Sequence, residues 1–239
     1  MATPQSKPSP SRRDNWKMFD RIAGRYDLLN HLLSANIDKR WRQVVARHLP
    51  ERDNLRVLDL ACGTADQLLT LHDSGRVSAG IGLDLAENML ALGRVKITAR
   101  GLDQSLVLKT GNAEDIPFED EQFDAVSISF GIRNMVDVMQ ALTEMDRVTK
   151  PHGRALILEF SLPTNKLFRS LYLFYLRHIL PMLGRIISGD SGAYRYLNET
   201  IETFPYGDEF CRLMRLAGFA KAVAHPLTFG IATLYVGEK

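Results

Sequence analysis

Short apolar runs alternate with helical patterns through the middle of this 239-residue chain, and no other feature constrains the fold as strongly. Most of the runs are nearly continuous apolar segments, which is typical of strands buried on both faces of a sheet. A strand–helix–strand succession predicts right-handed crossovers and a parallel sheet flanked by helices. The predicted strands are 56–61, 79–85, 106–111, 123–129 and 154–160, and the predicted helices between them are 66–73, 86–100 and 136–149.

Both ends of the chain depart from this alternation. Two helical patterns, 16–26 and 37–48, precede the first strand. A helix near 207–217 precedes two closely spaced strand-like runs, 220–227 and 230–237. Because only a short link separates these runs, we expect them to pair antiparallel at one end of the sheet. The prediction is a single α/β domain over 14–239 with a mostly parallel sheet.

The composition argues against several classes of protein. Apolar residues make up 45% of the chain and charged residues 24%, as in ordinary soluble proteins. The net charge of +2 and the lack of a zinc-finger or RNP-like pattern predict no nucleic-acid partner. Cys62 and Cys211 lie far apart, which favours a reducing cytoplasm over a disulfide framework, and the histidine spacing predicts no metal site. The basic, Pro/Ser-rich residues 1–13 resemble a disordered tail and not a secretory signal.

Small and polar residues follow consecutive predicted strands, at the sheet edge where α/β proteins bind ligands. Each position also has a structural interpretation. The turn at Gly63 can be an ordinary connection, and Asp84 can cap the next helix as readily as it can bind ribose hydroxyls. Asn112 can shape a turn instead of contacting an adenine. Together they predict a nucleoside pocket, whose candidate residues are Gly63, Thr64, Asp84, Asn112, Ala113 and Ser129.

The turn after the first strand indicates which nucleoside. A dinucleotide site needs a glycine-rich G-x-G-x-x-G turn, whereas this turn, VLDLACGTAD, contains only Gly63 and places Asp66 at the helix start. That carboxylate repels phosphate, and the chain has no P-loop pattern. A cationic, phosphate-free nucleoside fits better, and S-adenosylmethionine is such a molecule. Asp59, which lies in the strand before the turn, joins the predicted cofactor site.

Several stretches resemble the ubiquinone/menaquinone biosynthesis C-methyltransferases. They are MFDRIAGRYDLLNHLLSANIDKRWR, VLDLACGTAD, GLDLAENML, GNAEDIPFEDEQFDAVSISFGIRN, RVTKPHGRALILEFS and YRYLNETIETFP, and the likeness runs from about Met18 to the C-terminus. The resemblance implies a Rossmann-like, seven-stranded methyltransferase of class I with one antiparallel edge strand, S-adenosylmethionine as donor and a polyprenyl hydroquinone as acceptor. The sequence departs from the family pattern at Ala65, where glycine is usual, and at Thr149 and His152, which precede the fifth strand.

Methylation of a quinol ring carbon requires a phenolate, because a neutral ring carbon is a poor nucleophile. Arg133, which follows the fourth strand, is the candidate to stabilise that oxyanion, and Asn134 the candidate to orient it. Asp27 and His225 are alternative candidates for the base. Each also has a structural interpretation, since Asp27 can pair with Arg25 and His225 can be a core or edge residue.

The segment 161–196 fits no strand–helix unit, and its centre, 167–187, is rich in leucine and aromatic residues. A core helix is one interpretation. A lid that receives an isoprenoid tail and lies on the inner face of a membrane is the other, because apolar surface fringed by cations binds anionic bilayers. Pro181 should kink the segment. The cations of the segment are Lys166, Arg169, Arg177 and Arg185.

Some alternatives stay open from the sequence. The acceptor ring can be a demethylmenaquinol, our first expectation, or the methoxy-polyprenyl benzoquinol precursor of ubiquinone. A small-molecule N- or O-methyltransferase, or an inactive binding module, can share the fold, and a homodimer is not excluded. Only Ala65 favours the inactive module. Because Asp66 begins the predicted helix, we expect residue 65 to have a negative φ, so that alanine is tolerated there.

Overall fold

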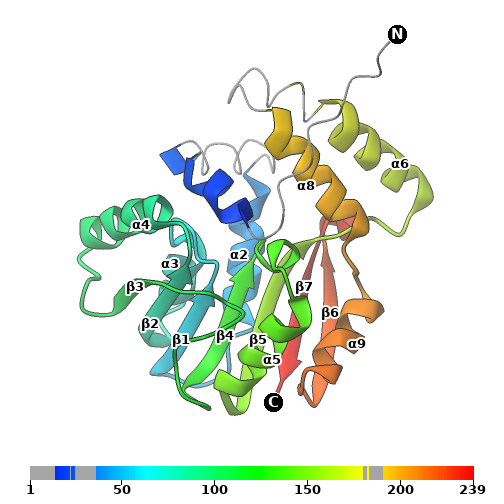
Figure 1. Cartoon of the computed structure of the whole chain (residues 1–239). Helices are drawn as coiled ribbons and strands as arrows, with labels where there is room; N and C mark the ends of the chain where they lie inside the picture. Colours follow the sequence, from blue (N-terminus) through cyan, green and yellow to red (C-terminus); the bar gives the residue numbers. More distant parts are fainter. Residues whose placement is uncertain (1–13, 22, 25–35, 180–181, 183–190) are drawn as a thin grey trace.

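A single seven-stranded sheet runs through the computed structural model, which describes residues 14–21, 23–24, 36–179, 182 and 191–239 (Figure 1). The strand order is β3-β2-β1-β4-β5-β7-β6. Neighbouring strands from β3 to β5 are parallel, and β7 pairs antiparallel with both β5 and β6. The strands are β1 (Leu55–Leu60), β2 (Val77–Asp84), β3 (Leu106–Thr110), β4 (Phe123–Ser129), β5 (Thr149–Phe160), β6 (Lys221–Leu227) and β7 (Ala232–Glu238).

The predicted alternation is confirmed, including the antiparallel pairing of the last two strands. The strand that runs against the others, β7, lies one position inside the sheet, because β6 pairs along its outer side. The parallel order changes direction at β1 and β4, so the carboxyl ends of these two strands meet beside a crevice. This crevice is where an open α/β sheet binds its ligand.

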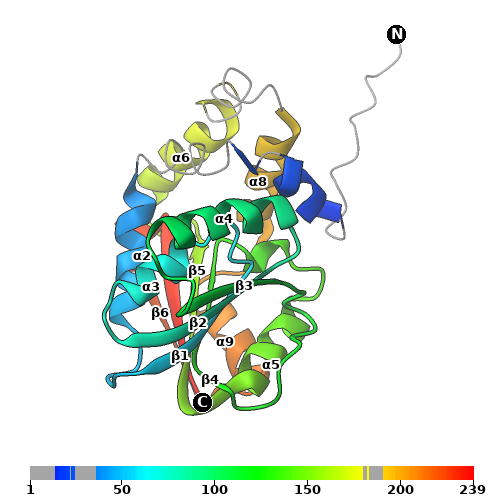
Figure 2. The same cartoon turned by 90° about the vertical axis from the view of Figure 1, so that its left-hand side faces the viewer.

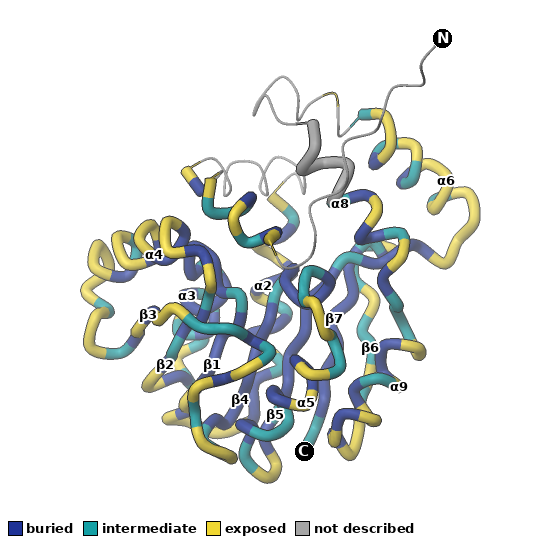
Figure 3. Tube along the Cα trace, viewed as in Figure 1, coloured by how far each residue is buried: buried dark blue, intermediate teal, exposed yellow. Residues whose placement is uncertain are grey.

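Helices cover both faces of the sheet and bury a separate core on each (Figure 2). On one face lie α2 (Ile37–Arg47), α3 (Asp66–His72) and α4 (Glu87–Ala99). On the other lie α5 (Val138–Val148) and α9 (Asp208–Leu216). The central strands β1, β4, β5 and β7 are buried along most of their length, which explains their nearly continuous apolar sequence, whereas the edge strands β3 and β6 are more exposed (Figure 3).

The fifth strand begins five residues before its predicted start, directly after α5. In the sequence-based prediction, residue 149 ends the preceding helix and 150–153 are unassigned. Thr149 pairs with Phe123 and Arg154 with Ala125, so residues 150–153 lie in a register shift, and His152 there has a φ of 63°. Thr149 and His152, the two departures from the family pattern, therefore lie at the end of β5 opposite to the ligand crevice.

The insertion forms helices beyond the carboxyl end of β5 (Figure 1). These are α6 (Lys166–Phe174), the π-helix η3 (Tyr175–Ile179) and α8 (Ser191–Thr203). A small apolar cluster that includes Tyr172 and Ile201 joins α6 to α8. Pro181 and Arg185 fall outside the described residues. In the described part of the chain, each helix is too short or too polar to cross a membrane.

Candidate functional site

The turn after β1 owes its shape to alternating residues in the left-handed region. Ala61, Gly63 and Ala65 have φ values of 46°, 54° and 67°. The prediction of a negative φ at Ala65 is wrong, because Ala65 is the N-cap of α3 and the helical backbone begins only at Asp66. A left-handed alanine costs about 1 kcal/mol relative to glycine.

The methyl group of Ala65 nevertheless stays clear of the ligand crevice. Ala65 is fully buried, and its Cβ lies 3.3 Å from the position that a Cβ would occupy on Gly93 of α4. The side chain packs on α4 and lines neither of the two cavities described below. The one feature that favoured an inactive binding module therefore places no atom in the site.

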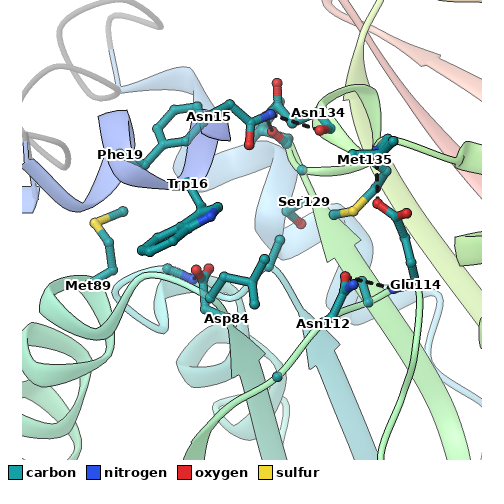
Figure 4. Close-up of a pocket in the computed structure, with 18 residues that line it drawn as sticks. Asn15, Trp16, Phe19, Asp84, Met89, Asn112, Glu114, Ser129, Asn134 and Met135 are labelled. Atoms are coloured by element: carbon teal, nitrogen blue, oxygen red, sulfur yellow. Dashed lines mark hydrogen bonds between the residues drawn. The ribbon is translucent and has the colours of Figure 1, made fainter. Parts of the chain in front are cut away.

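A cavity of about 270 Å³ lies at the crevice, at the carboxyl ends of the central strands (Figure 4). The predicted residues Gly63, Asp84, Asn112, Ala113, Ser129 and Asn134 all line it. They come from loops after four different strands and η2 (Ile132–Asn134). The fold therefore brings most of the predicted site together in one place.

Asp84 ties the walls of this cavity together. Its Oδ2 accepts a hydrogen bond from the Gly63 N–H at 2.8 Å, and its Oδ1 accepts one from the Ala86 N–H at 2.8 Å. The predicted alternative, a side-chain cap of α4, is not realised, because the N-cap of α4 is Ala86. Burial raises the pKa of Asp84, and the backbone N–H groups oppose that rise. Each carboxylate oxygen keeps acceptor capacity for a ribose hydroxyl.

The loop after β3 forms the opposite wall. Asn112 Oδ1 accepts from the Glu114 N–H at 3.0 Å, so Asn112 does shape a turn, and its residue also faces the cavity. Glu114 accepts from the backbone N–H groups of Val136 and Asp137, which links this loop to the segment after η2. The sequence carries no signal for Glu114, because an isolated acid in a loop is most often solvated.

The N-terminal segment supplies a wall that the sequence analysis missed. Asn15, Trp16 and Phe19 line the cavity, and residues 15–21 are helical (Figure 4). Asn15 Nδ2 donates to the Asn134 carbonyl at 2.8 Å, and Asp20 Oδ1 accepts from the Asn88 N–H at the start of α4. The spacing of Trp16 and Phe19 is also that of any helix that packs on a core, so the pattern alone could not assign them.

A second, smaller cavity lies on the other side of the Gly63 turn. Asp59, Thr64, Gln67 and Ser129 line it, and Gly63 and Ser129 border both cavities. Ser127 donates to Asp59 Oδ1 at 2.6 Å, and Ser129 donates to Gln67 Oε1 at 3.0 Å. Asp59 Oδ2 and Gln67 Nε2 are buried and have no hydrogen-bond partner among the described residues.

This unpaired acceptor and unpaired donor fit an amino acid group. Buried polar atoms are almost always hydrogen-bonded, so Asp59 Oδ2 and Gln67 Nε2 point to a ligand with an ammonium and a carboxylate. Burial raises the pKa of Asp59 to about 7, and the Ser127 hydrogen bond opposes that rise. The larger cavity, of about 270 Å³, could hold the adenosine of S-adenosylmethionine, and the polar atoms around the smaller one, of about 20 Å³, could contact its amino acid end, whose ammonium Asp59 would hold.

Arg133 is buried. Its Nη1 donates to Glu159 Oε1 at 2.6 Å and to the Phe130 carbonyl at 2.6 Å. The guanidinium also lies 5.3 Å from the centre of the Phe160 ring. Arg133 does not line the larger cavity, whereas its neighbour Asn134 does. Glu159 is fully buried, and this burial raises its pKa while Arg133 opposes the rise.

Of the two candidate bases, Asp27 and His225, the structure describes only His225. Asp27 lies outside the described residues, as does Arg25. His225 lies on β6, where its ring packs on that of His48 at a centroid distance of 4.8 Å. It lines neither cavity. His225 therefore occupies the edge position that was its alternative interpretation.

The sheet order, the turn after β1 and the acid at the end of β2 define an S-adenosylmethionine-dependent methyltransferase. Solved structures share this fold. A methyltransferase from Thermotoga maritima superposes with a TM-score of 0.62 at 20% identity, over 94% of this chain and 99% of that one. The [4+2]-cyclase SpnF superposes with a TM-score of 0.64 at 16% identity, over 98% and 99%.

The chain belongs to the ubiE/COQ5 methyltransferase family, whose model matches residues 10–239. A relative from Geobacter sulfurreducens named ubiquinone/menaquinone biosynthesis C-methyltransferase UbiE is 45% identical over 223 residues, which are 93% of this chain and 87% of that protein. A demethylmenaquinone methyltransferase from Geobacillus kaustophilus is 41% identical over 224 residues, 93% and 95% of the two chains. The resemblance identified from the sequence is confirmed.

Ala65→Gly should leave cofactor affinity within about tenfold of the natural protein. Relief of about 1 kcal/mol of backbone strain is offset by the loss of a buried methyl group, worth about 0.8 kcal/mol. Calorimetry with S-adenosylhomocysteine measures the affinity, and thermal melting measures the change in stability. A gain in affinity of several hundredfold would show that alanine impairs the natural site.

Cofactor binding should release a proton from Asp59. Because the pKa of this carboxyl is about 7 and only the carboxylate pairs with an ammonium, affinity should fall as the pH drops below that value. The limiting slope is about tenfold per pH unit. Titrations near pH 6 in buffers of different ionisation enthalpy count the protons released. Asp59→Asn should bind more weakly and without this pH dependence; an unchanged dependence in that variant would assign the proton to another group.

Proposed function

We propose that this enzyme transfers a methyl group from S-adenosylmethionine to a ring carbon of a polyprenyl hydroquinone in quinone biosynthesis. The observation that carries the proposal is the family match over residues 10–239, with relatives named for quinone methylation that are 41–45% identical across 93% of the chain. Demethylmenaquinol is our preferred candidate for the acceptor, and 2-methoxy-6-polyprenyl-1,4-benzoquinol is the alternative. The relative from Geobacter sulfurreducens is named for both pathways, and that from Geobacillus kaustophilus for the first.

The bound cofactor supplies an electrophilic methyl group on a sulfonium. The task of the protein is then to favour the phenolate of the acceptor and to hold its ring in line. Arg133 suits the first part, because Nη1 is occupied by Glu159 and Phe130 while the buried Nε has no partner among the described residues. Asn134 suits the second part, holding the ring in line. Its buried Oδ1 has no partner among the described residues, and Asn134 lines the larger cavity.

The acceptor ring is proposed to lie beside the Arg133–Glu159 pair and under α6. Tyr172 of α6 is buried close enough to feel both charges of this pair, and its phenol has a raised pKa because of burial. The aromatic and polar groups there suit a flat ring with hydroxyls at its edge. Asp27 stays our candidate for the base, acting on the phenol proton.

The insertion is proposed to form a lid that receives the isoprenoid tail and attaches the enzyme to the cytoplasmic face of a membrane. Three apolar side chains of α6 are exposed: Leu167 (73%), Leu171 (60%) and Phe174 (58%). Phe229, which is 82% exposed, extends the apolar surface through ring contact with Phe168. Lys166 and Arg169 fringe this surface, whereas Arg177 is paired with Glu202.

The substrate is tested by a mass-spectrometric quinone profile of cells that lack the protein. Accumulation of demethylmenaquinone supports the first acceptor, and accumulation of the methoxy-polyprenyl benzoquinol supports the second. Restoration by the natural gene but not by an Asp84→Ala variant would tie the profile to methyl transfer. An unchanged profile would contradict the proposed function.

Arg133→Lys should lower kcat about a hundredfold or more while cofactor affinity stays near normal. Lysine keeps the charge but lacks the planar fork that reaches Glu159, Phe130 and an acceptor oxygen together. Steady-state kinetics and calorimetry separate the two effects, and thermal melting tests folding. Arg212→Lys, at an exposed position of α9, is the matched control. Loss of cofactor binding in parallel with kcat would reassign Arg133 to the cofactor site.

Leu171→Asp should reduce sedimentation with anionic liposomes about tenfold, because it places a charge in the proposed insertion face. Binding of the natural protein should also fall with added salt, since each basic residue near the surface contributes about 1 kcal/mol. Leu216→Asp on α9 is the matched control, because Leu216 is 65% exposed on a different helix. Equal loss in both variants, or binding indifferent to anionic lipid, would argue against this face.

A further inference from the structure

Arg42 of α2 is a nearly buried cation at the smaller cavity. It is 9% exposed, and its Nε has no hydrogen-bond partner among the described residues. Asp38 Oδ2 forms a loose ion pair with it at 3.9 Å, too far for a hydrogen bond, and Arg42 also opposes the rise in the pKa of the buried Asp59. A buried N–H donor without a hydrogen bond is costly, and an anionic acceptor placed beside Nε would remove that cost.

The surroundings of Arg42 show where such a partner would sit. Arg42 lines the smaller cavity together with Asp59, Gln67 and Ser129. Its guanidinium carbon lies 5.5 Å from the centre of the Phe130 ring, and Phe130 lines the larger cavity. The cation therefore reaches from α2, a helix that precedes the sheet, to the rim that the two cavities share.

The smaller cavity presents a set of charges complementary to an amino acid zwitterion. Within the described part of the chain, Asp59 Oδ2 is an unpaired acceptor on one side, and Arg42 Nε and Gln67 Nε2 are unpaired donors. Asp59 would attract an ammonium, and the two donors would attract a carboxylate. With only Asp59 and Gln67 the cavity would carry no cation to balance the carboxylate of a bound ligand.

We propose that Arg42 is the recognition residue for the carboxylate of the methionyl group of S-adenosylmethionine. The inference rests on the proposed methyl donor and adds the residue that distinguishes the intact donor from adenosine ligands that lack its carboxylate. Arg42 acts by charge-assisted hydrogen bonds, and Gln67 adds a neutral donor. Lys39 and Arg47 lie on the same helix but line only the outer groove between α2 and α3, so they do not duplicate this role.

Calorimetry with ligands that differ by single groups tests the proposal. S-adenosylhomocysteine carries both the carboxylate and the ammonium. Decarboxylated S-adenosylmethionine keeps the ammonium but lacks the carboxylate, and methylthioadenosine lacks both groups. Arg42→Leu, which keeps the apolar stem, should weaken S-adenosylhomocysteine roughly 10- to 150-fold. The affinities of the other two ligands should change by less than about twofold, within the scatter of such measurements. Arg47→Leu, an exposed position on the same helix, should change none of them.

The outcomes separate recognition from a structural role. Equal weakening of all three ligands by Arg42→Leu, or no weakening of S-adenosylhomocysteine, would overturn the proposal. If Arg42→Leu does not fold, Arg42→Lys gives the same test: it keeps a charge without the fork and should lose part of the preference for S-adenosylhomocysteine over methylthioadenosine. Failure of the natural protein to bind S-adenosylhomocysteine would instead contradict the methyl donor.

Discussion

The two hydrogen bonds that Asp84 accepts hold the site together. One fixes the Gly63 turn after β1, and the other fixes Ala86 at the start of α4. Because the carboxylate is largely removed from water, these N–H groups are what make its charge tolerable there. The loop after β1, the end of β2 and the axis of α4 are therefore positioned by one side chain.

Buried charges around the site are only partly compensated. Arg133 and Glu159 pair directly and make further hydrogen bonds to the backbone. Arg133, Asp59 and Arg42 each have one buried polar atom without a partner among the described residues. Buried polar atoms without hydrogen bonds are unfavourable, so under the proposed assignment a zwitterionic ligand would lower the electrostatic cost of the free protein. These groups would then favour such a ligand before any contact with the adenine.

The sheet could be predicted closely from sequence because continuous apolar runs have few other uses in a soluble chain. The errors occurred where a local pattern has two meanings. The fifth strand was expected to start at residue 154, yet residues 149–153 belong to β5, since a register shift accommodates His152. Ala65 was expected to be helical, yet the cap geometry of α3 places it in the left-handed region. Arg42 drew no attention, because an arginine on an amphipathic helix is most often solvated.

Residues of the site are separated by long stretches of sequence, and this has a consequence for synthesis. The bond from Asn15 to Asn134 spans 119 residues, and that from Asp20 to Asn88 spans 68. The N-terminal segment leaves the ribosome first, yet its docking surfaces on α4 and η2 are made much later. The turn after β1 and the end of β2 can assemble while this segment waits, and Trp16 can complete the pocket only after β4 has joined the sheet. A segment that is translated before its docking surfaces is thus among the last to find its native contacts, and it leaves the pocket open to solvent until then.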